Sequence, residues 1–542
     1  MKKLVNYLKD NILIIIFTLL ESFLQVYGYL LSNDKSIANF NGKYILIFII
    51  LFLILYLINN IYFKVLMIKY NKDKKDKKFS KKRFFIIWGI IFALWIPILL
   101  AYYPGIWSYD VIRQTPHINN TEMNSFQPLL HTLIIEFFLI IGKKISSYEL
   151  GVFLLSIFQS LIMSSIFAYS IEKINITIEN KKLSYIFFTL SIIYFGIVPF
   201  NSIMAISTTK DVLFSGFLLL LIIWTYDIIN FEKINKRKKC IFIFVSILFM
   251  LIKNNAVNIY GIYSILLILF SKKDTKRLFT KICCCSLFIY FFLYLGLVII
   301  FKPVKGNYNE KYSIQMQNMS YVAIKHFEDI QHFYPFNNEC VRNNYKEYYE
   351  KNNVDQTKIL FLSCFNNTID NSMESFNNKK FINNWIKYGI KYPTDYFDSG
   401  GNLYIGSWYL NDTSHSYSIY DFKSYLTTII FWGKLNIEYN SKIPWLKDKY
   451  ELVAQGDFQY KKYPFFRYIF EPASYILSFF LMIIFLLKSD RKKDIIPLTP
   501  LIIIYFSILT GPCIIVRYIY PYMVIVPLLF FRIISNNKRE AN

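Results

Sequence analysis

The chain has few charged residues for its length. Asp, Glu, Lys and Arg make up 18% of its 542 residues, whereas about a quarter of an average soluble protein is charged. Hydrophobic residues make up 55%, and they occur in blocks of about twenty, the length at which a helix crosses a bilayer. These features exclude a soluble enzyme, a coiled coil and a disordered scaffold. They predict an all-α polytopic membrane protein.

Residue patterns that hold metals or nucleotides are also lacking. The chain has five histidines and seven cysteines, and none of them has the spacing of a zinc site. No glycine-rich nucleotide loop is evident. No cofactor is therefore firmly implied, and a divalent metal has no supporting motif. Cys340 and Cys364 lie together in a polar region, where they either form a disulfide or stay reduced.

Positive charge is plentiful but unevenly placed. The chain has 61 Lys and Arg against 36 Asp and Glu, a formal net charge of +25. The cations cluster between apolar blocks, which is typical of a membrane topology and argues against nucleic acid as a partner. The bias of Lys and Arg among the short loops predicts about twelve transmembrane helices in the cell membrane, with both termini cytoplasmic.

The apolar blocks give the predicted spans directly. They lie near residues 11–32, 44–66, 84–103, 150–171, 183–200, 211–231, 240–270, 282–301, 468–487, 494–510 and 514–533. The block 240–270 is interrupted at 253–255, so we expect two short helices that meet there. Residues 127–142 are interpreted as an interfacial helix on the outer surface, because a crossing there would move the basic loop 232–239 outside.

Four regions follow from this topology. They are an N-terminal transmembrane hairpin with a basic cytoplasmic loop (1–83), a transmembrane core with its first outer loop at 104–149 (84–301), an extracytoplasmic mixed, α-rich domain between spans nine and ten (302–467), and C-terminal transmembrane helices with a basic tail (468–542). The extracytoplasmic domain is rich in aromatic and polar residues. This composition suits contact with a sugar or glycolipid, and it equally suits an ordinary folded domain.

The first outer loop contains a candidate catalytic carboxylate. Asp110 follows the third predicted span closely, beside Trp107 and Tyr109, which together with Arg113 are predicted to contact the substrate. A carboxylate in a partly dry setting can accept a proton from a hydroxyl nucleophile. Alternatively, Asp110 caps a helix or pairs with Arg113.

A second candidate group opens the interfacial segment. Gln127 and Pro128 precede His131, and Pro128 suits the first turn of a helix. His131 either orients the phosphate of a substrate or anchors the helix among lipid headgroups.

Three cations are predicted to lie at the outer leaflet. Lys210, followed by Asp211, opens the sixth span; Lys253 lies at the break in 240–270; and Arg517, followed by Tyr518, begins the last span. Cations in an apolar setting are costly and usually functional. Together they could bind the phosphate of a lipid. Each of them could instead reach ordinary lipid headgroups.

The order of these features resembles that of a known superfamily. An outer-loop Asp, a Pro-Leu interfacial helix and a Lys-Asp pair opening a later span, together with the large outer domain, resemble the C-type superfamily of multi-pass glycosyltransferases. The likeness is greatest to an uncharacterised group of Gram-positive bacterial membrane proteins, and it covers roughly 85–530. The motifs that carry it are Tyr103–Gly105 followed by Asp110, Gln114 and Gln127–His131, together with Ser313–Gln317, Tyr392–Tyr396 and Arg517–Pro521.

The resemblance implies an activity and a substrate class. It implies that Asp110 is the catalytic carboxylate of an inverting glycosyltransferase, whose donor is a polyprenyl-phosphate-linked sugar. Gln127 stands where many members have His, and a second acid is lacking until Glu122, so metal dependence and donor identity stay open. The acceptor would be a glycan, lipid or protein of the cell envelope. The rival hypotheses are a non-enzymatic lipid-linked-glycan transporter or assembly protein, and an inactive relative.

Overall fold

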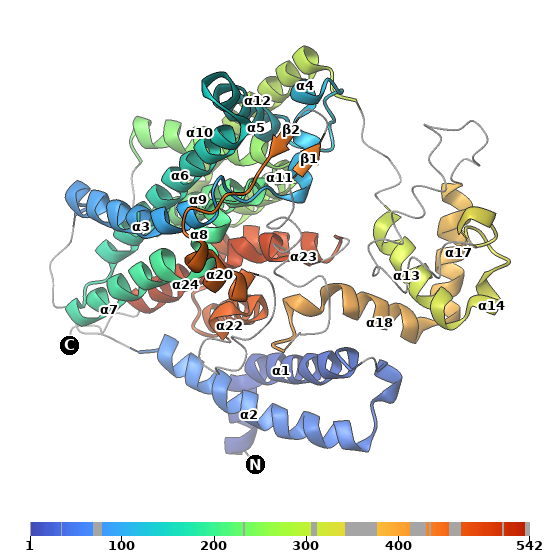
Figure 1. Ribbon diagram of the computed structural model, residues 1–542. Coiled ribbons are helices and arrows are strands. Elements are labelled where there is room, and N and C mark those ends of the chain that lie inside the picture. Colours follow the sequence, from blue (N-terminus) through green and yellow to red (C-terminus); the bar gives the residue numbers. More distant parts are fainter. Residues whose placement is uncertain are drawn as a thin grey trace.

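The computed structural model consists mainly of helices (Figure 1). It describes residues 2–33, 35–68, 78–230, 234–304, 312–341, 377–411, 430–432, 435–454, 468–511 and 514–536. Within these residues, seven helices are long and apolar enough to cross a membrane, or up to eight if the bent pair Lys181–Ile197 and Pro199–Ala205 forms one span. The helical character and the presence of several membrane-length apolar helices are therefore confirmed. The total of about twelve spans stays a prediction.

Three parallel helices form the centre of the bundle, namely α6 (Tyr148–Thr177), α9 (Lys210–Asn230) and α24 (Val516–Ser535). Ion pairs join α9 to α24 near both ends, Asp211 to Arg517 at 3.8 Å and Asp227 to Arg532 at 3.7 Å. Because start is joined to start and end to end, the two helices run in the same direction. Lys173, near the end of α6, also pairs with Asp227, at 2.7 Å. We call the two ends of the bundle the Asp211 end and the Asp227 end.

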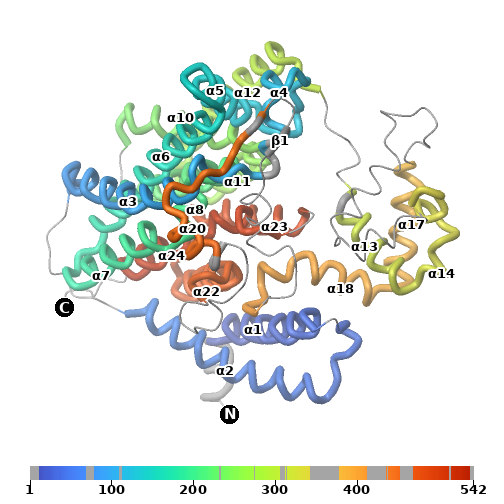
Figure 2. Tube along the Cα trace, viewed as in Figure 1, coloured from blue at the N-terminus to red at the C-terminus, as the bar shows by residue number. Residues whose placement is uncertain are grey.

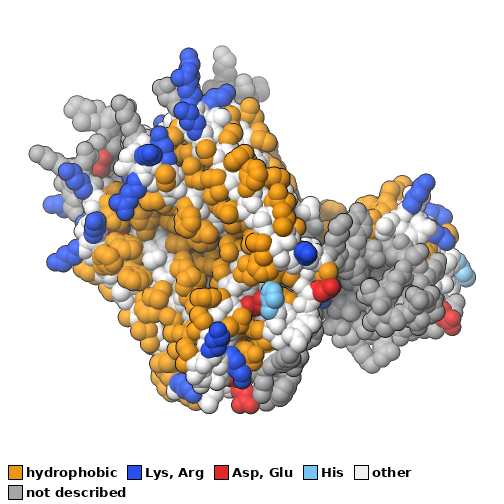
Figure 3. Space-filling view, turned by 90° about the horizontal axis from the view of Figure 1, so that it is seen from above, with side chains coloured by type: hydrophobic (Ala, Val, Ile, Leu, Met, Phe, Trp, Pro, Cys, Tyr) orange, Lys and Arg blue, Asp and Glu red, His pale blue; other side chains and the backbone are white. Residues whose placement is uncertain are grey.

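Burial of the helices follows their sequence. α9 is apolar on all sides, and 83% of its membrane-length window is buried, as expected for a helix in the middle of a bundle. The corresponding fraction is only 6% for α12 (Lys273–Phe301) and 11% for α2 (Gly42–Leu66). Figure 3 shows a broad hydrophobic face, with Lys and Arg mainly around its edges. Such a surface suits contact with lipid chains.

The two segments that were ambiguous in the sequence are well defined. The helices α10 (Lys236–Ile252) and α11 (Ala256–Phe270) are separated at residues 253–255, so the predicted break is confirmed. The segment 127–142 forms most of α5 (Leu129–Ile145), with Pro128 at its N-cap. Sequence analysis therefore located both features to within a few residues.

The helix α5 lies antiparallel to the first half of α6. Their backbones meet at Gly142 and Gly151, and the rings of Phe138 and Phe158 are 5.0 Å apart. Since α6 begins at the Asp211 end, α5 leads away from the Asp227 end and does not connect the two ends. Its predicted place at the membrane surface stays a prediction.

The other described helices complete the bundle. They are α1 (Lys2–Leu31), α3 (Lys81–Ala101), α7 (Lys181–Ile192), α8 (Pro199–Ala205), α22 (Pro472–Lys488) and α23 (Thr499–Ile508). Short helical segments connect them: η1 (Ile37–Asn39), η2 (Tyr109–Gln114), α4 (Pro116–Asn119), η3 (Ile193–Ile197), η5 (Ile405–Ser407) and η7 (Lys492–Leu498). The helices α1 and α2 form a hairpin along one side of the bundle (Figure 2).

Part of the predicted outer domain is a small helical body beside the bundle (Figure 1), composed of α13 (Ser313–Lys325), α14 (Phe327–Ile330), α17 (Asn378–Lys391) and α18 (Pro393–Tyr404). It has its own apolar core, which includes Met316, Met319 and Phe381. The helix α18 also reaches the N-terminal hairpin, because the Tyr27 hydroxyl in α1 donates a hydrogen bond to Asp398 Oδ1 at 3.1 Å.

The later part of the region 302–467 packs on the bundle instead. An antiparallel hairpin of β1 (Ile430–Trp432) and β2 (Leu435–Ile437) lies on α6, and α20 (Pro444–Ala454) lies on α3. These segments therefore share cores with the bundle rather than with the small helical body of α13, α14, α17 and α18. Cys340 is disulfide-bonded, and Cys364, the partner that the sequence left open, lies outside the described residues.

Candidate functional site: a cation cluster at the Asp211 end

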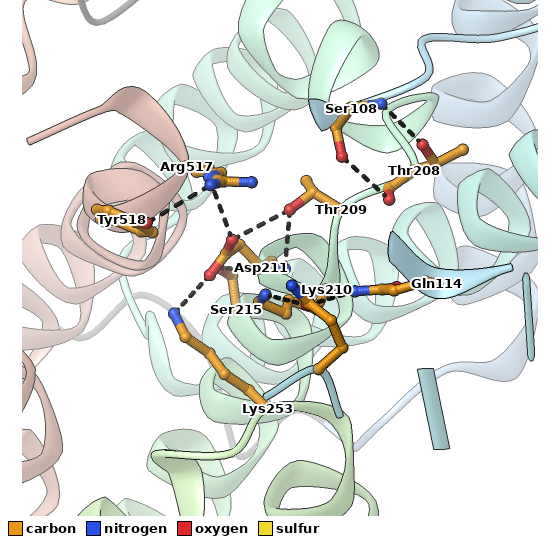
Figure 4. Close-up of polar contacts among 11 residues, drawn as sticks. Ser108, Gln114, Thr208, Thr209, Lys210, Asp211, Ser215, Lys253, Arg517 and Tyr518 are labelled. Atoms are coloured by element: carbon orange, nitrogen blue, oxygen red, sulfur yellow. Dashed lines mark hydrogen bonds and ion pairs between the residues drawn. The ribbon is translucent and has the colours of Figure 1, made fainter. Parts of the chain in front are cut away.

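A buried carboxylate lies at the centre of the cluster. Asp211 is in the first turn of α9 and is completely buried. Its Oδ1 accepts a hydrogen bond from Lys253 Nζ at 2.5 Å, and its Oδ2 lies 3.8 Å from Arg517 Nε. Figure 4 shows that these three side chains converge from α9, the α10–α11 break and the start of α24. Residues that are far apart in the sequence thus form one charged cluster.

Aromatic rings line the two cations. Lys253 Nζ lies 4.6 Å from the centre of the Phe214 ring and 5.4 Å from that of Tyr518, and the Arg517 guanidinium carbon lies 5.3 Å from the Tyr518 ring. Cation–π contacts of this kind favour the charged forms where water is scarce. Tyr518 thus lies beside both cations, and its predicted contact with a substrate stays a prediction.

The break between α10 and α11 explains how Lys253 reaches the carboxylate. Lys253 follows the last residue of α10 in an extended conformation. The next residue, Asn254, donates hydrogen bonds to the backbone oxygens of Ser125 and Phe126, at 3.0 and 2.8 Å. These bonds fasten the break to the loop that precedes α5, so the interruption seen in the sequence has a positioning role.

Lys210 forms its hydrogen bond with a residue other than the adjacent Asp211. Its ammonium donates a hydrogen bond to Gln127 Oε1 at 2.9 Å. The same oxygen accepts from Gln114 Nε2 at 2.7 Å, and Gln114 Oε1 lies 2.7 Å from His131 Nδ1. Gln127 and His131 were predicted as site residues and are brought together here. Gln114 lies in the candidate loop but was not predicted as a site residue, because the sequence does not show that its amide is buried.

A backbone contact holds the first outer loop against the start of α9. Ile106 pairs with Ser207 in a parallel bridge, and Ser108 N donates to Thr208 Oγ1 at 3.1 Å. Gly105 has φ +136°, and a Cβ at this position would overlap Ser156 Oγ. Only glycine fits comfortably here, which explains the Tyr-Pro-Gly motif structurally. The loop and Lys210 consequently lie at the same end of the bundle.

The remaining predicted residues of this loop are placed unequally. The backbone of Tyr109 and Asp110 lies in η2, but their side chains are outside the described residues. Arg113 is exposed. Trp107 is completely buried in an apolar cluster with Val111 and residues of α5 and α6. The predicted contacts of these four residues with a substrate stay predictions.

Two further polar groups near the loop were not singled out as site residues. Glu136 in α5 is buried, and its Oε2 lies 2.5 Å from His117 Nδ1. The Tyr439 hydroxyl accepts a hydrogen bond from Trp107 N at 3.3 Å. Burial raises the pKa of Tyr439, so this hydroxyl stays protonated at neutral pH. Glu136 thus fastens α4, and Tyr439 fastens the loop before η2.

No group of three or more His, Cys, Asp or Glu side chains that could hold a metal occurs among the residues that the structure describes. A narrow cavity does occur, but at the Asp227 end, where Lys173, Asp227 and Arg532 line it. Lys173 and Arg532 each pair with Asp227. The cavity is therefore separate from the cation cluster.

The fold and the cluster define a helical membrane-type protein with a charged site at one end of its bundle. The model of a family described as "Family of unknown function (DUF6020)" matches residues 118–542, and the chain belongs to this family. The match includes Gln127, His131, Lys210, Lys253 and Arg517, together with Asp211, and it begins after η2. No curated protein and no solved structure matches the chain.

Proposed function

We propose that the protein is an integral-membrane glycosyltransferase that moves a sugar from a polyprenyl-phosphate donor to an acceptor of the cell envelope, on the outer face. One observation carries the proposal: Lys210, Lys253 and Arg517 converge from three elements at the Asp211 end. Among the described side chains of this cluster, three cations face one carboxylate. An excess of positive charge in a largely buried place suits a phosphate group.

The chemistry assigned to the cluster is phosphate binding. In the proposed complex, the donor enters from the bilayer and its phosphate lies against the three cations. Arg517 suits bidentate contact with phosphate oxygens because its guanidinium is planar. The aromatic rings of Phe214 and Tyr518 bound the site and limit access of water. Such a setting strengthens the attraction between phosphate and cations.

Asp110 is the proposed general base, on the strength of the sequence resemblance. It removes the proton of the acceptor hydroxyl, whose oxygen attacks the anomeric carbon of the sugar. The bond from that carbon to the phosphate oxygen breaks, and the lipid phosphate leaves with the bonding electrons. Direct displacement inverts the anomeric centre. Lys210, Lys253 and Arg517 stabilise the charge that develops on the leaving phosphate.

The proposal includes a membrane topology. About twelve spans would cross the cell membrane, with both termini cytoplasmic and residues 302–467 extracytoplasmic. The Asp211 end would face outward, and the Asp227 end would face the cytoplasm. The small helical body of α13, α14, α17 and α18 would then lie on the same side as the cation cluster, where it could contact an acceptor.

The test is release of lipid phosphate by purified protein in nanodiscs. A pool of radiolabelled polyprenyl-phosphate sugars is supplied with envelope acceptors, and the wild type is compared with Asp110→Asn. General-base catalysis contributes about 10²–10⁴-fold, so we expect turnover of the variant to fall by that factor. Equal turnover by both proteins would contradict the role of Asp110. If the wild type binds the lipid but releases no phosphate, the non-enzymatic glycan transporter is supported instead.

A further inference from the structure

A continuous series of side-chain hydrogen bonds links Lys210 to His131. It runs from Lys210 Nζ to Gln127 Oε1, from Gln114 Nε2 to the same oxygen, and from Gln114 Oε1 to His131 Nδ1. The exposed fractions of Gln114, Gln127 and His131 are 1%, 4% and 2%. These side chains come from η2, the loop before α5, and α5 itself, whereas Lys210 begins α9. The series thus connects four parts of the Asp211 end.

The direction of each hydrogen bond is fixed by the lysine. An ammonium group only donates, so the oxygen of Gln127 must face Lys210. Gln114 is also directed at this oxygen, so it must present its amide nitrogen there and its oxygen to His131. That oxygen only accepts, so Nδ1 of His131 carries a proton. The orientation of amides and the tautomer of a histidine are usually ambiguous, but here one cation determines all three.

The tautomer has a chemical consequence. When the imidazole is neutral and Nδ1 is protonated, the lone pair is on Nε2. His131 then offers Nε2 as its acceptor of a proton or hydrogen bond. If the opposite tautomer formed, two acceptors would face each other across 2.7 Å inside the protein. Burying such an unsatisfied contact costs about 1–3 kcal/mol.

We propose that Gln114 is a positioning residue that transmits the orientation set by Lys210 to His131 and holds its ring in the Nδ1–H tautomer. Gln114 is also the last residue of η2, the segment that contains Asp110. The same amide therefore ties the segment of the proposed base to the lysine of the phosphate site. The inference rests on the proposed function for the identity of the ligand, but the tautomer requires no ligand.

The experiment is nitrogen NMR of the full chain in nanodiscs, with histidine labelled at both ring nitrogens. The five histidines are resolved by two-bond proton–nitrogen correlation at about pH 8, above the ordinary histidine pKa of about 6.5. A His131→Gln sample identifies the His131 signals by their loss. We expect a protonated Nδ1 and an unprotonated Nε2. The opposite pattern would overturn the proposal.

Variants separate transmission from a general structural effect. Gln114→Leu should remove the preference for Nδ1–H, whereas Gln114→Glu should keep it, because a carboxylate still accepts from Nδ1–H. Lys210→Met should weaken the preference although it does not touch the ring. The matched control is Gln25→Leu, which removes a buried glutamine bonded to the backbone at Trp408 and Leu410, away from the series; it should leave the tautomer unchanged.

The outcomes also separate this inference from the proposed function. An unchanged tautomer in Gln114→Leu, or a change of equal size in Gln25→Leu, would overturn the positioning role. If the tautomer behaves as expected and no donor is turned over, the positioning role is supported and the proposed glycosyltransferase activity is contradicted. Gel filtration of each variant checks that the protein is folded. If Gln114→Leu does not fold, Lys210→Met decides instead, because an unchanged tautomer in that variant would overturn the transmission from Lys210.

Discussion

Asp211 holds two cations that would otherwise repel each other. Lys253 and Arg517 have side chains only 15% and 17% exposed, and both are directed at this carboxylate. Removing one partner of a buried ion pair costs about 3–5 kcal/mol. We therefore expect Asp211→Asn to lower the free energy of unfolding by about that amount, as measured by thermal denaturation in nanodiscs.

A double variant tests the cause of this loss. If the repelled cations are responsible, Lys253→Met should restore part of the stability in the Asp211→Asn background, although alone it is destabilising. Such a coupling appears as non-additivity in a double-mutant cycle. Strictly additive losses of stability would mean that repulsion between the two cations does not cause the effect of Asp211→Asn.

The cations also give a prediction for ligand affinity. In the proposed complex, Lys253→Gln and Arg517→Gln each remove one charged contact to phosphate, which is worth about 1–3 kcal/mol. The dissociation constant for polyprenyl phosphate should rise accordingly, as measured by binding to protein in nanodiscs. Lys442→Gln is the control, since Lys442 is an exposed cation near Tyr103 at the same end. An equal weakening by the control would point to attraction by net charge alone.

Sequence analysis singled out charged residues that interrupt or border apolar blocks. Lys253 interrupts an apolar block and Lys210 opens one, so their positions were visible in the sequence. Their partners were not, because adjacency in the sequence pairs Lys210 with Asp211, whereas the structure pairs Asp211 with Lys253 and Arg517. Gln114 could be recognised only when the fold placed it between Gln127 and His131.

At the scale of elements, the contact between α5 and α6 depends on two glycines. A Cβ on Gly151 would lie 2.7 Å from Leu139 Cα, and a Cβ on Gly142 would overlap the backbone of Gly151. Backbone cannot move aside as a flexible side chain does, so a methyl group would force the helices apart. Overpacking of this kind typically costs about 1–3 kcal/mol.

Gly151→Ala is the corresponding prediction. It should lower the melting temperature and loosen α5, which hydrogen exchange of that helix would detect. The control is Gly261→Ala in α11, where a Cβ would meet nothing within 4 Å. In a helix, this control replacement favours folding by up to about 1 kcal/mol. Similar destabilisation by both replacements would exclude the close contact as the cause.

Helix boundaries were predicted better than helix associations. The break at 253–255 and the start of α9 follow from local sequence, because charged and polar residues interrupt apolar blocks there. The pairing of α5 with the first half of α6 was not predicted, since apolar faces do not specify which neighbour they contact. The division of the region 302–467 between a helical body and segments on the bundle was likewise not visible.

At the scale of the whole molecule, the segments that connect the helices α6, α9 and α24 to the rest of the chain divide between the two ends of the bundle. Lys173, Asp227 and Arg532 bring together the ends of α6, α9 and α24, and the sequence predicts that all three ends are cytoplasmic. A reporter fused at position 236 in the following basic segment should therefore be cytoplasmic. External activity of that reporter would contradict the predicted topology and would put the Asp211 end, with Lys210 and the loop bonded to it, on the cytoplasmic side.

The spacing of the ion pairs at the two ends of α9 and α24 predicts which bilayer thickness suits the protein. With a rise of about 1.5 Å per residue, Asp211 and Asp227 are about 24 Å apart along the helix, whereas a typical hydrocarbon layer is about 30 Å thick. Mismatch of this size favours thinner bilayers. We expect the melting temperature to be highest in vesicles of short-chain phosphatidylcholine and to fall as the acyl chains lengthen. Arg532→Leu, which removes the ion pair between α24 and Asp227 and leaves the pair of Asp227 with Lys173, should flatten this dependence. A melting temperature that rises with chain length would show that the charged ends do not set the preferred thickness.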